Sequence, residues 1–132
     1  MPGAMIYPSF RRDFFRGQVD LMTQPVKAVL VGTGYKPDKG HSTASDLTDE
    51  IEGPGYVQGG QELTGKAIED ADEDVQTFRA TDLSWPDSTL KARGLVLCVG
   101  KKLVCHYDFG RQRQSDGGNF LVKWDPEGIF TL

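Results

Sequence analysis

Short apolar runs, several of them rich in β-branched residues, alternate along the chain with polar segments that contain glycine and proline. The run Val26–Val31, bounded by a proline and a glycine, predicts a strand. Two further runs, Leu90–Val99 and Leu103–Phe109, flank the turn Gly100–Lys102 and predict a β-hairpin. The pattern therefore favours short strands joined by tight turns over long helices.

The remaining strand signals come from both sides of this hairpin. The segments Gln61–Glu69 and Val75–Leu83 flank an acidic link and predict a second hairpin. Apolar residues at alternate positions from Phe120 to Trp124 predict a half-buried strand, and a turn then leads into a last strand, Ile129–Leu132. Strands at intervals of roughly 10–15 residues indicate a mainly β fold, an antiparallel β-sandwich or a barrel-like single domain.

One short helix of about two turns is predicted near the N-terminus, starting at Phe10. Phe10 and Phe14 are four residues apart, which places both rings on one helix face. Ser9 is the expected N-cap with Pro8 outside the helix, and Gly17 is the expected C-cap.

The chain divides into an N-terminal arm with this helix, residues 1–24, and a β-rich region, residues 25–132, within a single domain. Residues 32–60 form a long glycine-rich loop, in which Ser45–Ile51 can form one helical turn. A connection of this length is unusual inside a compact domain and is often functional.

Composition narrows the class of protein. The 132 residues contain 15 Lys and Arg against 19 Asp and Glu, a net charge of −4 that argues against a dedicated nucleic-acid binder. The apolar runs are much shorter than the about 20 residues that a membrane span needs. The N-terminus lacks the pattern of a secretory signal, and two cysteines without such a signal indicate a reducing cytoplasm.

Motifs for cofactors and metals are incomplete. Gly32–Gly34 follows a strand as a dinucleotide loop would, but Pro37 stands at the third glycine position. The acidic run 69–74 lacks the central glycine and distal glutamate of a calcium loop and is interpreted as a solvated hairpin tip. His41 and His106 have no partner at metal-ligand spacing. We therefore expect no cofactor, no metal site and no enzymatic activity.

The two cysteines lie on either side of the turn in the predicted central hairpin. Depending on the register of this hairpin, Cys98 faces either Cys105 or Leu103 across the two strands. Cysteine also packs as a small apolar residue, so we interpret both cysteines as free, buried thiols.

One cluster combines cations with aromatic rings, the residue types enriched at protein interfaces. We interpret it as a contact through which the N-terminal arm packs on a neighbouring subunit, with nucleic-acid docking as the alternative. The cluster comprises Phe10, Arg11, Arg12, Phe14, Phe15 and Arg16.

A second aromatic set, Trp85, Trp124 and Tyr107–Phe109, could form a sugar-binding surface. Aromatic residues at alternating strand positions are more often packed in the core. A carbohydrate-binding surface module is thus an alternative function that depends on exposure of these rings.

Ten short segments follow one another in an order that is characteristic as a set, although no single one is specific. They are Gly17–Leu21, Val26–Val31, Gly34–Asp38 with His41, Gly53–Gly60, Leu63–Lys66, Ala80–Trp85, Leu90–Leu97, Asp108–Gly110, Gly117–Asp125 and Gly128–Leu132. This order, over about 110 residues, resembles a family of small virion proteins that tailed bacteriophages encode, usually near the capsid genes. The compact turn Gly100–Lys102 departs from the family, whose members often carry a longer, Thr-rich insertion there.

The resemblance implies a non-enzymatic structural protein on the outer capsid surface of the virion, made in the bacterial host cytoplasm. Its expected partners are the major capsid protein or other virion proteins. The chain could also form a homo-oligomer such as a trimer, and we expect it to bind neither nucleic acid nor a membrane. A head decoration or cement protein is the first expectation, and a neck or tail component is the alternative.

Overall fold

The computed structural model describes residues 4–72, 75–126 and 128–131 of the chain. It is mainly β, with 46% of residues in strands and 9% in helices, and it forms one small domain of three antiparallel sheets and a short N-terminal helix. The predicted fold class is therefore confirmed. No helix in the described residues is long and apolar enough to cross a membrane.

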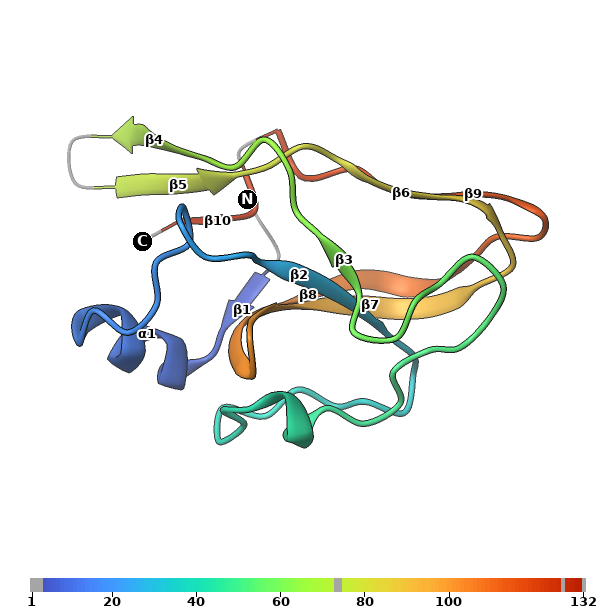
Figure 1. Ribbon diagram of the computed structural model, residues 1–132, viewed down its shortest axis with the longest axis horizontal. Coiled ribbons are helices and arrows are strands. Elements are labelled where there is room, and N and C mark those ends of the chain that lie inside the picture. The colour runs from blue at the N-terminus through green and yellow to red at the C-terminus, as the bar shows by residue number, and fades with distance from the viewer. Residues whose placement is uncertain (1–3, 73–74, 127, 132) are drawn as a thin grey trace.

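The largest sheet has five strands and occupies the middle of the molecule (Figure 1). Its centre is the predicted hairpin, in which Leu95 pairs with Tyr107 and Cys98 pairs with Leu103. The predicted strand that begins near Val26 lies beside this hairpin. In spatial order the strands are β1 (Ala4–Ile6), β8 (Lys102–Gln114), β7 (Lys91–Val99), β2 (Lys27–Val31) and β3 (Gln61–Glu62).

Two smaller sheets form a second layer over one face of the central sheet (Figure 1). One has three strands in the order β10 (Phe130–Thr131), β5 (Val75–Arg79) and β4 (Ala67–Asp72). The other pairs β6 (Leu83–Ser88) with β9 (Gly118–Val122). The main apolar core fills the space between the two layers.

The predicted second hairpin is correct only in its middle part. Its first half divides at Gly65, whose φ of +62° belongs to the left-handed region that favours glycine. The residues before this point join β2 in the central sheet, and those after it form β4 and pair with β5. The second half also divides, because Leu83 begins β6 in the other small sheet. Of the predicted acidic link at residues 70–74, Asp70–Asp72 belong to β4, and residues 73–74 lie outside the described residues.

Apolar side chains cover both faces of the central sheet. One face packs against the small sheets, and the other packs a second cluster that includes Val29, Val96 and Leu103. Strands buried on both faces need apolar residues at consecutive positions, which explains the uninterrupted runs in the sequence.

The first part of the glycine-rich loop, residues 32–60, packs on the second face of the central sheet, and its later part reaches the main core. Tyr35, Ile51 and Tyr56 are buried and fix the loop to the body of the domain. Within the loop the predicted helical turn is shorter and earlier than expected, a 3-10 turn over Ala44–Asp46. Thr43 and Asp46 cap the start of this turn reciprocally, and the extended backbone of Leu47 ends it after three residues.

The N-terminal helix α1 spans Pro8–Phe15. The predicted N-cap is wrong, because Tyr7 occupies that position and Pro8 is the first helical residue, where proline needs no backbone N–H. The C-cap is Arg16, one residue before the expected Gly17. Gly17 follows it with a φ of +70°, the left-handed conformation in which glycine commonly ends a helix.

The N-terminal segment belongs to the packed body of the domain. Tyr7 and Phe10 are completely buried, and Ala4–Ile6 pair with β8. The arm of residues 1–24 therefore packs into the β-rich body, to which it supplies an edge strand and two core aromatic residues.

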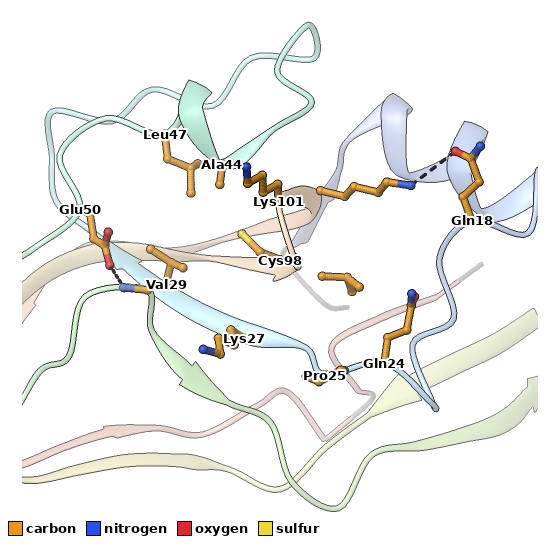
Figure 2. A pocket seen from close by; sticks show the side chains of 14 residues that line it. Gln18, Gln24, Pro25, Lys27, Val29, Ala44, Leu47, Glu50, Cys98 and Lys101 are labelled. Carbon is orange, nitrogen blue, oxygen red and sulfur yellow. Dashed lines mark hydrogen bonds between the residues drawn. The ribbon is translucent and has the colours of Figure 1, made fainter.

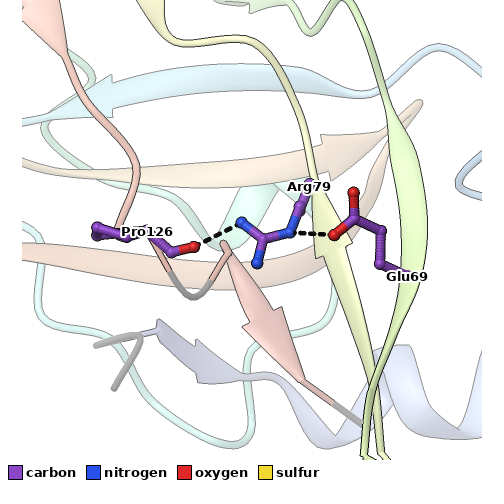
Figure 3. A network of polar contacts seen from close by, with 3 residues as sticks. All are labelled: Glu69, Arg79 and Pro126. Atoms are coloured by element: carbon purple, nitrogen blue, oxygen red, sulfur yellow. Dashed lines mark hydrogen bonds and ion pairs between the residues drawn. The ribbon is translucent and has the colours of Figure 1, made fainter.

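Arg79 connects the three-stranded sheet to the C-terminal segment (Figure 3). Its Nε donates to Glu69 at 2.7 Å, and its Nη1 donates to the backbone oxygen of Pro126 at 2.7 Å. This network lies on one face of the β4–β5 hairpin and leaves the opposite face, with Ile68 and Phe78, toward α1.

Candidate functional site

A groove with a volume of about 430 Å³ separates α1 from the three-stranded sheet, and we call it the α1 groove. Arg11, Phe14 and Phe15 form its helix side, because positions three and four apart share one helix face. The sheet contributes the other side. The further lining residues are Leu21, Ile68, Gln76, Thr77, Phe78 and Phe130.

The α1 groove exposes an unusual amount of apolar surface. Phe15 is 84% exposed, Ile68 is 52% exposed and Phe14 is 48% exposed. The rings of Phe14 and Phe10 have centroids 5.9 Å apart, and Phe10 lies 5.9 Å from Phe130 in the core. The exposed rings are therefore supported from below by a row of packed aromatic rings, a geometry typical of an interface anchor.

Charges of opposite sign border the α1 groove. On the helix side, Arg11 lines the groove and Arg12 and Arg16 are exposed close by. On the sheet side, Asp70 pairs directly with Gln76, which lines the groove, and accepts a hydrogen bond from it at 3.1 Å. Directly paired residues share one face of a sheet, so the Asp70 carboxylate lies on the groove side.

The structure brings together only part of the predicted interface cluster. Arg11, Phe14 and Phe15 meet in the α1 groove, and Arg12 and Arg16 remain exposed. Phe10 requires a correction, because its ring is completely buried among the core aromatics and offers no surface to a partner.

Sequence reasoning missed the sheet side of the groove. Ile68, Phe78 and Phe130 come from strands far from α1 in the sequence. The one local signal was Ile68, an apolar residue in a strand followed by acidic residues. Its position opposite α1 depends on the strand order, which no local pattern specifies.

A second hollow of about 770 Å³ lies between the central sheet, the glycine-rich loop and the segment before β2 (Figure 2). Lys27 and Lys101 line it from different elements and do not converge on one point in this view. Its carboxylate, Glu50, is already engaged by the Tyr56 hydroxyl at 2.7 Å and the Gly59 amide at 2.8 Å. The hollow thus lacks a convergent set of polar groups.

Cys98 contributes to the floor of this second hollow, and Cys105 lies in the main core. Both are free, as predicted, and the register pairs Cys98 with Leu103 and Cys105 with Leu97. Burial raises the pKa of the Cys98 thiol to about 12 and also raises the pKa of Cys105. Since the thiolate is the reactive form, neither thiol is suited to nucleophilic chemistry.

The rings of both histidines lie beside the ring of Tyr35. The Tyr35 hydroxyl hydrogen-bonds to the Tyr7 hydroxyl and to His41 Nδ1, the latter at 2.9 Å. Burial lowers the pKa of His106, whose ring lies 5.8 Å from that of Tyr35. Among the described residues, no three His, Cys, Asp or Glu side chains are grouped so that they could hold a metal ion.

The predicted sugar-binding surface is not formed by the two tryptophans. Trp85 is 3% exposed and packs against Phe120, with ring centroids 6.0 Å apart. Trp124 is 9% exposed, and its Nε1 donates to the Thr81 carbonyl at 3.1 Å. The packing of the sandwich buries both indoles, so the carbohydrate-binding alternative loses its two tryptophans, whereas Tyr107 and Phe109 are partly buried.

Comparisons with known proteins find no relative of this chain. No family model matches the chain, and searches of the curated proteins and of the solved structures return no match.

Proposed function

We propose that this chain is a non-enzymatic structural protein of a tailed bacteriophage particle, and that it acts as a head decoration or cement protein that binds the major capsid protein lattice. The order of sequence segments that resembles such virion proteins supports this role. A neck or tail component is the second position in the particle that the same resemblance allows.

The observation that carries the proposal is the α1 groove with its exposed Phe14 and Phe15. Large apolar side chains exposed together on a small protein mark a contact with another macromolecule. Aromatic rings beside arginines are the combination most enriched among residues that dominate interface energetics. An assembly protein needs such a surface, because its function is the contact itself.

Co-sedimentation of the purified protein with particles that lack it tests the proposal, followed by imaging of the particles. We expect saturable binding, with added density at symmetry-related positions of the head. Density at the portal vertex or along the tail would select the neck or tail alternative. Absence of binding to any part of the particle would refute the structural role.

A matched pair of variants distinguishes a specific role of the α1 groove from the general effect of losing an exposed apolar side chain. Phe15→Ser removes the most exposed ring of the α1 groove, whereas Val57→Ser changes a 75% exposed residue on the glycine-rich loop. We expect Phe15→Ser to weaken assembly into the particle and Val57→Ser to leave it unchanged. Equal effects of the two changes would contradict a specific role for the groove.

A further inference from the structure

The α1 groove has two sides that differ in charge but share one apolar floor. The helix side presents the Arg11 guanidinium, and the sheet side presents the Asp70 carboxylate. Among the described residues, Arg11 forms no ion pair, and Asp70 has only its 3.1 Å hydrogen bond to the neutral Gln76 amide. Each charge can therefore accept an external partner of opposite sign.

A surface with one cationic side and one anionic side is complementary to itself after a two-fold rotation. In such an arrangement residue i of one copy meets residue j of the other, and the contact occurs twice. The rotation brings the Arg11 side of each copy against the Asp70 side of the other. It also brings the two exposed Phe15 rings to the centre, where each can enter the apolar groove of the partner.

We propose that the α1 groove is the contact between two copies of this chain, formed by reciprocal Arg11–Asp70 pairs around buried Phe14 and Phe15 rings. This inference rests on the proposed function and makes the dimer, rather than the single chain, the unit that joins the particle. A purely acidic foreign partner would satisfy Arg11 but would place its charge against Asp70. A second copy satisfies both sides at once.

Sedimentation of the full chain without any phage particle tests self-association directly. We expect a concentration-dependent dimer, with a dissociation constant below about 1 mM. Phe15→Ser should raise that constant about tenfold or more, because truncated aromatic anchors dominate such losses. Val57→Ser should leave it unchanged. A circular dichroism spectrum and melting temperature close to those of the parent chain show that each variant is folded.

Charge reversal tests the pairing itself. Arg11→Glu places two acidic residues against each other at each of the two contacts, and Asp70→Lys places two basic residues there, so each variant alone should lose the dimer. An equimolar mixture of the two variants restores opposite charges at both contacts and should form a heterodimer. The heterodimer should weaken as salt concentration rises, since exposed pairs are screened.

Three outcomes would overturn the inference. They are a chain that stays monomeric at millimolar concentration, a dimer that Phe15→Ser does not weaken, and charge variants that fail to recover on mixing. None of them decides the proposed function, because binding to particles is measured separately. A monomeric chain that still binds particles through Phe15 would assign the groove to a different virion protein.

Discussion

Replacing Phe10 with alanine tests whether the N-terminal segment is part of the core. The ring is completely buried, and its centroid lies 5.9 Å from those of both Phe14 and Phe130. Truncating a buried phenylalanine to alanine costs about 3–5 kcal/mol, the sum of lost transfer energy and the remaining cavity. A domain of this size has a free energy of unfolding of about 5–15 kcal/mol, so the loss is a large fraction of the total.

The melting temperature makes this loss easy to measure. One kcal/mol corresponds to roughly 3–5 °C for a chain of this length, so Phe10→Ala should lower the melting temperature by roughly 10–20 °C. Urea unfolding followed by circular dichroism gives the free energy itself. The slope of the transition should stay constant if the same surface is exposed on unfolding.

Phe15→Ala is the matched control, since it makes the same chemical change in the same helix at a ring that is 84% exposed. Its effect on the free energy of unfolding should stay within about 0.5 kcal/mol. If Phe10→Ala costs as little as Phe15→Ala, the helix is not packed on the sheets and the core assignment of the N-terminal segment is wrong.

Three further predictions concern the backbone, a histidine and the thiols. Gly60→Ala should lower the free energy of unfolding by about 2–4 kcal/mol in urea titrations, because Gly60 has a φ of +90° and a Cβ there would lie 2.1 Å from the Ala28 carbonyl oxygen. Burial lowers the pKa of His106, so the unfolded chain binds its proton first and stability should fall as pH drops below about 6.5; His106→Gln should flatten this dependence between pH 7.5 and 5.5. Cys98 and Cys105 should resist iodoacetamide at pH 8 in the native protein and react fully in urea, as followed by mass spectrometry.

Local patterns were sufficient for the elements whose partners are close in the sequence. The β7–β8 hairpin was predicted because two apolar runs flank a glycine turn, and β4–β5 because two strands flank an acidic link. The division at Gly65 was missed, since a glycine in the left-handed region reads like any other glycine within a strand signal. Strand β1 was missed because three residues are too few to show a period.

Only the helix side of the α1 groove was predicted from the sequence, for the same reason. Three residues of the cluster chosen by residue type, Arg11, Phe14 and Phe15, line the α1 groove. Residue type could not separate Phe10 from them, because burial of that ring depends on Phe130 at the other end of the chain. Residue type indicated an interface, whereas tertiary packing decided which rings remain outside.

The contact between the two ends of the chain has a consequence for synthesis in the cell. β1 pairs with β8, and Phe10 packs against Phe130, so the core cannot close until residue 130 has left the ribosome. At 5–20 residues per second, the first segment waits on the order of ten seconds with its aromatic residues in water. Contacts between distant parts of a chain also slow folding. Premature termination before β10 would release a chain that lacks the ring against which Phe10 packs, and such products should be the preferred substrates of the cell's chaperones and proteases.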